Sequence, residues 1–164
     1  MYVSTQRVPN EFAIPDFVEV TNSVIENNNF CGGDGLLNFN GLSFEFVDTE
    51  VIGNGKNCED SERMTGSLTI SRALKQTTEV LHLNVENLEC RENFANLCSC
   101  ILIYDLNTIP DAVESFLIVN ASDFIENDSL IGNILFNTDP YFSVVFTGCS
   151  SFNNYNNDGN FHTF

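Results

Sequence analysis

Apolar and polar residues alternate along several short segments of the chain. In residues 78–88, Leu81, Leu83 and Val85 fall on one face and the residues between them are polar. Residues 42–46, 66–72 and 141–147 alternate in the same way. Because successive side chains of a strand point to opposite faces, this period of two predicts strands with one buried face. No segment carries a helical stripe longer than two turns.

Turn-forming Asn, Asp, Gly and Pro residues separate these segments. Short strands with such turns between them are typical of antiparallel architectures. The sequence therefore predicts an all-β fold, a single-domain antiparallel β-sandwich of about seven to nine strands stabilised by disulfides, with a barrel-like closure as the alternative. Residues 66–72 and 78–88 are expected to form a hairpin, and no internal repeat is predicted.

The composition changes after residue 149. We expect residues 1–149 to form one β-rich domain and residues 150–164 to form a polar C-terminal tail that also contains aromatic residues. One interpretation is a frayed terminus. The other is a segment that docks on the same molecule or on a neighbour through its aromatic side chains, and the tail-docking candidates are Phe152, Tyr155, Phe161 and Phe164.

Six cysteines are compatible with three disulfides, with buried thiols or with a metal site. Cys98 and Cys100 share a face if they lie in a strand, so they are expected to bond different partners. The favoured pairing joins Cys31 to Cys58, Cys90 to Cys98 and Cys100 to Cys149. Disulfides indicate an oxidising compartment. The expected location is therefore extracellular or at the cell surface. The first residues lack the apolar region of a signal peptide, which leaves three alternatives: an intracellular protein, a leader that has been removed, or export by another route.

The charge narrows the choice of partners. Among 164 residues, 23 are Asp or Glu and six are Lys or Arg, which gives a net charge of −17. General electrostatics therefore excludes a nucleic-acid or anionic membrane surface as partner, and no apolar run is long enough for a transmembrane helix. Oxygen ligands on loops suit calcium, so Asp123, Glu126 and Asp128 are candidate calcium ligands, with a solvated acidic loop as the alternative.

Candidate catalytic chemistry is sparse. His82 and His162 are isolated, and no nucleophile motif accompanies them. A reactive cysteine needs basic neighbours to lower its pKa, and no basic residue follows Arg91. We therefore predict that the chain is not an enzyme.

The spacing of the cysteines at 31/58, 90/98 and 149 resembles that of the lipid-recognition sandwich family. The sequence departs from that family's pattern at Cys98-Ser99-Cys100. The resemblance implies an apolar ligand held between two sheets, whereas an ordinary core would use the same side chains. The pocket candidates are Phe44, Phe46, Leu83, Phe142 and Phe146.

Two functions follow as expectations. The first is a non-catalytic extracellular structural or protein-interaction module that self-assembles through an edge strand or the aromatic tail. The alternative is a secreted β-sandwich carrier of an apolar ligand such as a lipid. For the first function, we expect low pH, salt or calcium to promote self-association by weakening the repulsion between acidic chains.

Overall fold

The computed structural model describes residues 2–4, 17–28, 31, 35–40, 43–59, 66–71, 80–104, 114–132 and 134–156. These residues form sixteen β-strands and no helix. The strands belong to three sheets, A, B and C, and every pairing between them is parallel.

Each sheet takes its strands from successive passes of the chain. In spatial order, sheet A contains β1 (Tyr2–Ser4), β4 (Leu37–Asn40), β6 (Gly66–Ser71), β9 (Cys98–Tyr104) and β13 (Leu135–Asn137). Sheet B contains β2 (Phe17–Thr21) with β3 (Val24–Glu26), then β5 (Ser43–Ile52), β7 (His82–Arg91), β10 (Ser115–Asn120) with β11 (Asp123–Ile125), and β14 (Phe142–Thr147) with β15 (Ser150–Phe152). Sheet C contains β8 (Phe94–Ala95), β12 (Asp128–Ser129) and β16 (Tyr155–Asn156).

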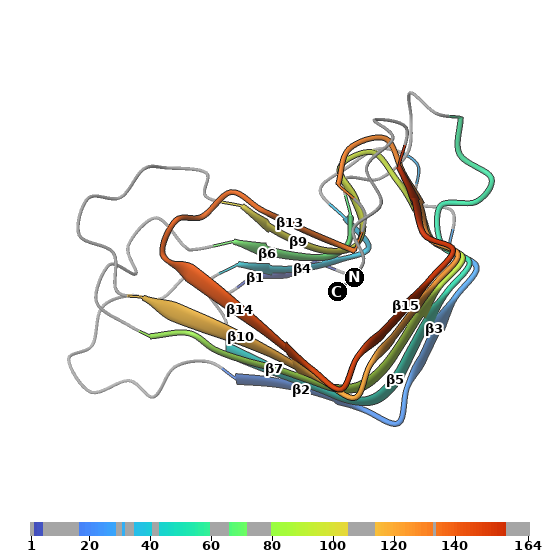
Figure 1. Cartoon of the computed structure of the whole chain (residues 1–164). Helices are drawn as coiled ribbons and strands as arrows, with labels where there is room; N and C mark the ends of the chain where they lie inside the picture. Colours follow the sequence, from blue (N-terminus) through green and yellow to red (C-terminus); the bar gives the residue numbers. More distant parts are fainter. Residues whose placement is uncertain are drawn as a thin grey trace.

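The chain therefore winds as a coil that passes from sheet A to sheet B and back, with sheet C between them in the later coils. Sheet A faces the bent sheet B across the interior, as Figure 1 shows. Equivalent residues of successive coils are 26, 39, 34 and 27 residues apart. Stacked units of this length, each in contact with its neighbours only, define a solenoid, here a parallel β-helix.

This architecture corrects the prediction of an antiparallel sandwich. The expected hairpin is also wrong, because β6 pairs with β4 and β9, whereas β7 pairs with β5, β10 and β11. Alternation of apolar and polar residues shows which face of a strand is buried, but it does not show the direction of the neighbouring strand. The internal repeat was missed because the coils differ in length by up to thirteen residues, the difference between 26 and 39.

The core lies between sheets A and B, where the side chains stack in columns. Phe44, Leu83 and Phe46 are at most 2% exposed, and Phe142 is 6% exposed. The ring of Phe39 in β4 lies 4.7 Å from the ring of Phe44 between centroids, and Phe44 lies 5.4 Å from Phe46. Phe44 and Phe46 thus pack in a core that aromatic pairs stabilise, whereas Phe146 is only partly buried at the edge of it.

Bends at fixed places turn each coil. Sheet B changes direction at a residue with positive φ in every coil (Figure 1), and these five residues form one column: Asn22, Asp48, Asn87, Ala121 and Gly148. A second column of positive φ ends the same sheet at Asn27, Gly53, Glu92, Glu126 and Asn153. Gly and Asn adopt this left-handed conformation most readily, which explains part of the turn-rich composition.

Two disulfides stabilise the fold, one between successive coils and one across a single coil. Cys31 and Cys58, which are 27 residues apart, bond with a Cα–Cα distance of 5.3 Å, as expected. Cys90 of β7 bonds Cys100 of β9 rather than Cys98, which ties sheet B to sheet A. Cys98 and Cys149 remain thiols, so the expected pair between Cys100 and Cys149 is absent. The two disulfides are typical of an oxidising environment.

Candidate interaction surfaces at the coil ends

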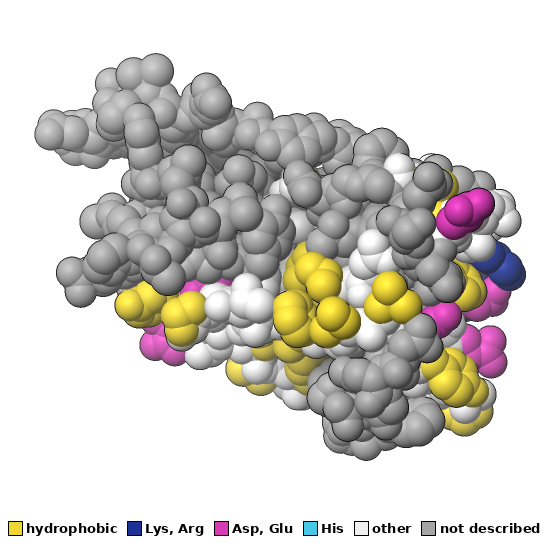
Figure 2. All heavy atoms as spheres, turned by 90° about the horizontal axis from the view of Figure 1, so that it is seen from above, with side chains coloured by type: hydrophobic (Ala, Val, Ile, Leu, Met, Phe, Trp, Pro, Cys, Tyr) yellow, Lys and Arg dark blue, Asp and Glu magenta, His cyan; other side chains and the backbone are white. Residues whose placement is uncertain are grey.

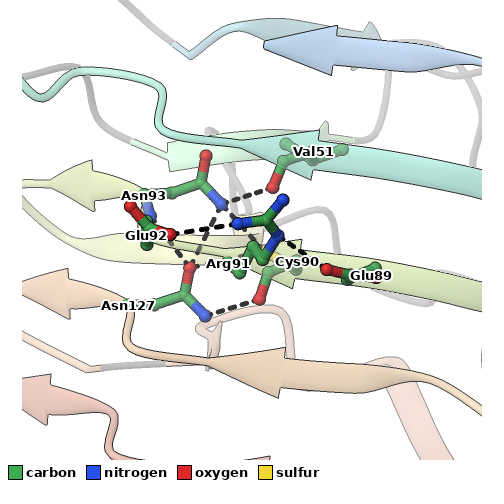
Figure 3. A network of polar contacts seen from close by, with 7 residues as sticks. All are labelled: Val51, Glu89, Cys90, Arg91, Glu92, Asn93 and Asn127. Carbon is green, nitrogen blue, oxygen red and sulfur yellow. Dashed lines mark hydrogen bonds and ion pairs between the residues drawn. The ribbon is translucent and has the colours of Figure 1, made fainter. Parts of the chain in front are cut away.

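A ladder of asparagines runs along the coil directly after the second column of bends. Asn54, Asn93 and Asn127 are completely buried, Asn154 is 5% exposed and Asn28 is exposed. Figure 3 shows Asn93 and Asn127 stacked on one another between neighbouring strands. The ladder satisfies buried main-chain groups at the corner where the strands end.

The ladder has a direction. The main-chain N and the Nδ2 of Asn54 donate to Oδ1 of Asn93 at 3.1 and 2.9 Å. Asn93 donates in the same way to Asn127, at 3.1 Å from both atoms. The second amide hydrogen points backwards, from Asn93 to the carbonyl of Val51 at 2.7 Å (Figure 3). Each of the three internal asparagines, Asn54, Asn93 and Asn127, therefore donates to the Oδ1 of the next coil and to a carbonyl of the preceding coil.

At the two ends of the ladder, local acceptors replace the missing neighbours. Asn28 donates forwards to Asn54, but its backward bond goes to the carbonyl of Glu26 in its own coil, at 3.1 Å. Asn154 donates backwards to the carbonyl of Phe124, and its other bond goes to Oγ of Ser151 in its own coil, also at 3.1 Å. At both ends, the Nδ2 group therefore has two acceptors, one of which comes from its own coil.

Apolar side chains that point into the core are incompletely covered at both ends. Val18, Val20 and Ile25 of the first coil are partly buried, whereas the residues stacked on them in β5, Phe44, Phe46 and Val51, are at most 1% exposed. In the last coil, Val144 and Phe146 are also only partly buried. Solenoids normally cover such ends with a polar capping unit, and the described residues contain no such unit.

Within the described part of the chain, no strand pairs with the outer side of β2 and β3 or with the outer side of β14 and β15. We call these the N-terminal edge and the C-terminal edge. Exposed strand edges present main-chain donors and acceptors that another chain can pair with. The C-terminal edge adjoins outward apolar side chains, namely Phe116, Ile118, Val145 and Phe152, which are 42–61% exposed.

Charge is distributed unequally between the two edges. The outward residues of the N-terminal edge include Glu19 and Glu26, whereas the outward residues of the C-terminal edge are uncharged: Ser143, Val145, Thr147, Ser150 and Phe152. Figure 2 shows exposed apolar groups beside acidic ones on the face that it draws. The edges therefore differ in chemistry as well as in position.

Acidic side chains also stack along the outside of sheet B between the edges. Glu50, Glu89 and Asp123 occupy one column on neighbouring strands. Arg91 lies beside this column, with its Nε 2.6 Å from Glu89 and its Nη1 3.0 Å from Glu92 (Figure 3). These half-exposed ion pairs offset part of the repulsion in the column, although exposed pairs contribute little to stability.

The candidate calcium ligands do not converge. Asp123 points outward from β11 and accepts a hydrogen bond from Ser150, Glu126 occupies a bend, and Asp128 begins β12. No group of three or more His, Cys, Asp or Glu side chains suited to a metal ion occurs in the described ranges.

The other sequence candidates are scattered. Phe152 and Tyr155 lie in β15 and β16 of the last coil, so the segment assigned to the tail begins within that coil. Phe161, Phe164 and His162 lie outside the described residues. Sequence reasoning missed the asparagine ladder, although Asn at the equivalent place in five turns was its visible signal.

Of the sequence's candidate base and nucleophile positions, the structure describes His82 and Cys98. His82 is exposed at the start of β7. Complete burial raises the pKa of the Cys98 thiol to about 12, because desolvation disfavours the thiolate. A thiol with that pKa is a poor nucleophile at neutral pH.

Comparison with known proteins finds no matching family model, no matching curated protein and no matching solved structure. A search of the described residues for a helix that could cross a lipid bilayer also finds none.

Proposed function

We propose that the chain is a non-catalytic extracellular structural module that associates with other polypeptide chains through the exposed edges of its end coils. The observation that carries the proposal is the partial exposure of core-facing apolar side chains at both edges, next to strands without an outer partner among the described residues. An added strand would cover these side chains and pair with the exposed main chain in one step.

Burial of these side chains favours association. Complete burial of a Val, Ile or Phe side chain contributes about 1.5–3 kcal/mol. Covering the exposed part of Val144 and Phe146, together with Val18, Val20 and Ile25 on the other side, therefore contributes a few kcal/mol in addition to the strand hydrogen bonds. The two disulfides support an oxidising, extracellular setting for such a module.

Sedimentation velocity over a wide range of protein concentrations tests the proposal. We expect concentration-dependent association that increases at low pH or in high salt, because both reduce the repulsion between chains of net charge −17. A double substitution, Val144→Ser with Phe146→Ser, removes apolar surface at the C-terminal edge and should weaken association. A protein that stays monomeric at millimolar concentration under all these conditions contradicts the proposal.

A further inference from the structure

The partner of the C-terminal edge follows from the direction of the asparagine ladder, provided that the edges associate as proposed above. We infer that this partner is the N-terminal edge of a second copy of the chain, added head to tail so that the coil continues in register from one molecule into the next. The inference rests on three independent matches between the two edges.

The first match is in the ladder. At an internal step, an asparagine donates from its main-chain N and its Nδ2 to the Oδ1 of the following coil. Asn154 is the last donor in the described ladder, and Asn28 is its first residue, with no coil before its Oδ1 among the residues that the structure describes. Placing Asn28 of a second copy after Asn154 brings an Oδ1 to the main-chain N and the Nδ2 of Asn154, in place of the local bond to Oγ of Ser151. The carbonyl of Ser151 would then replace that of Glu26 as the backward acceptor of Asn28.

The second match is in the bends. Both coils have a positive-φ residue at the two required positions, Asn22 and Asn27 in the first coil and Gly148 and Asn153 in the last. The two edges therefore have the same path through the corner of sheet B, and the same number of residues separates the bends. The strands of the two edges can therefore pair in one continuous register, without an extra residue in either strand.

The third match is in the side chains. Continuation of the register places Val18 on Val144 and Val20 on Phe146 inside the core. These residues are partly exposed, and within the described part of the chain each has a neighbouring coil on one side only. On the outside, Val145 lies opposite Glu19. No acidic residue meets another along this junction, because the outward residues of the C-terminal edge are uncharged.

The competing arrangements satisfy fewer of these conditions. Two N-terminal edges facing each other bring Glu19 and Glu26 of both copies to one interface, where like charges destabilise pairing. Two C-terminal edges facing each other place donors of Asn154 against donors of Asn154. Only the head-to-tail arrangement pairs a ladder donor with a ladder acceptor, and a heterologous contact of this kind extends into chains of copies.

Cysteine cross-linking of mixed variants tests the arrangement. Thr21 and Thr147 are exposed, outward residues of the two edges and occupy the same column. In a Cys149→Ser background, we expect an equimolar mixture of Thr21→Cys and Thr147→Cys to give disulfide-linked dimers in oxidising buffer. Adjacent in-register strands bring the Cα atoms within the range that a disulfide spans. Each variant alone should stay uncross-linked.

Glu86→Cys is the matched control, because Glu86 is exposed in the same column but lies on β7, away from both edges. It should not cross-link with either variant. If wild-type protein does not associate, the proposed function fails and this inference fails with it. A second outcome is that wild-type protein associates, but cross-links form only in samples that contain Thr147→Cys alone or Thr21→Cys alone. In that case the head-to-tail arrangement is wrong and the proposed function remains.

A charge pair at the junction gives a second readout that does not depend on oxidation. Val145→Lys places a cation opposite Glu19 of the next copy and should tighten association, whereas Val145→Glu should weaken it, each by about two- to fivefold. His82→Lys and His82→Glu make similar changes of net charge on a central strand and should have smaller effects. Equal weakening by both Val145 variants would indicate pairing of two C-terminal edges and would overturn the inference.

Discussion

Replacing an asparagine at the centre of the ladder should destabilise the fold far more than replacing the one at its start. In Asn93→Ala, Oδ1 of residue 93 is lost, and this atom accepts from both the main-chain N and the Nδ2 of Asn54. Asn54 is completely buried, so neither donor can turn to water. A buried donor left without an acceptor costs about 1–3 kcal/mol, and two of them cost about 2–6 kcal/mol.

Asn28→Ala is the matched control. Asn28 lies at the exposed end of the ladder, and no Nδ2 or main-chain N in the described part of its own chain donates to its Oδ1. Its substitution should therefore lower the free energy of unfolding by less than about 1 kcal/mol. Urea titration followed by circular dichroism measures both variants. Because a domain of this size is stable by only about 5–15 kcal/mol, the difference should be plain in the midpoints.

Asn93→Asp sharpens the test with pH. This substitution keeps an acceptor towards Asn54, but it replaces the donating amide by a carboxyl group in a completely buried place. Burial should raise the folded-state pKa above the unfolded value of about 4. The variant should therefore keep its stability below about pH 4 and lose about 1.4 kcal/mol for each pH unit above it, until the folded-state pKa is passed. Equal destabilisation of Asn28→Ala and Asn93→Ala, or a pH-independent loss in Asn93→Asp, would refute the role given to the ladder.

Three further predictions concern the cysteines and the bends. The double substitution Cys31→Ser with Cys58→Ser should lower the free energy of unfolding by about 2–4 kcal/mol, measured by urea titration without reductant, and an unchanged midpoint would contradict it. In native protein, a thiol reagent should label Cys149, which is partly exposed, and not Cys98, whose burial raises its pKa to about 12, as mass spectrometry of the labelled peptides can check. Ala121→Gly should raise the free energy of unfolding by about 0.5–1 kcal/mol, seen as a higher melting temperature, because Ala121 has a φ of 47° that glycine adopts without strain.

The sequence correctly predicted which faces of the strands are buried, but it did not predict which strands pair with one another. Leu68 and Ile70 are buried as their alternation indicates, and so is Leu83. Alternation depends on burial, which acts within one strand and is therefore visible locally. Pairing depends on which coil lies alongside, and in a solenoid that neighbour is 26–39 residues away. The hairpin placed between residues 66–72 and 78–88 failed because sequence proximity was taken as spatial pairing.

The candidate site was hidden for a related reason. Asparagine is a common residue in turns. In the sequence, Asn54 and Asn93 therefore resemble ordinary turn residues, and nothing local identifies them as members of one ladder. Alignment of the turns on their positive-φ residues makes the repeat visible, because an asparagine follows Asn27, Gly53, Glu92, Glu126 and Asn153 in every coil. The residue types at the bends vary from coil to coil, so the repeat is hard to recognise in the sequence. Two of the bends carry Glu92 and Glu126, although glutamate is unfavourable in the left-handed conformation.

The unequal charge of the two edges bears on how such a coil avoids uncontrolled association. Sheet proteins commonly protect an exposed edge with charged outward residues. The N-terminal edge has this protection in Glu19 and Glu26, and the C-terminal edge has none among its outward residues. Acidic side chains repel another acidic edge but tolerate a neutral one. This distribution therefore disfavours pairing between two N-terminal edges and leaves the neutral edge as the acceptable neighbour. Because the remaining acidic side chains act at longer range, the ionic strength should set how readily two copies approach, while the ladder should set which edges meet.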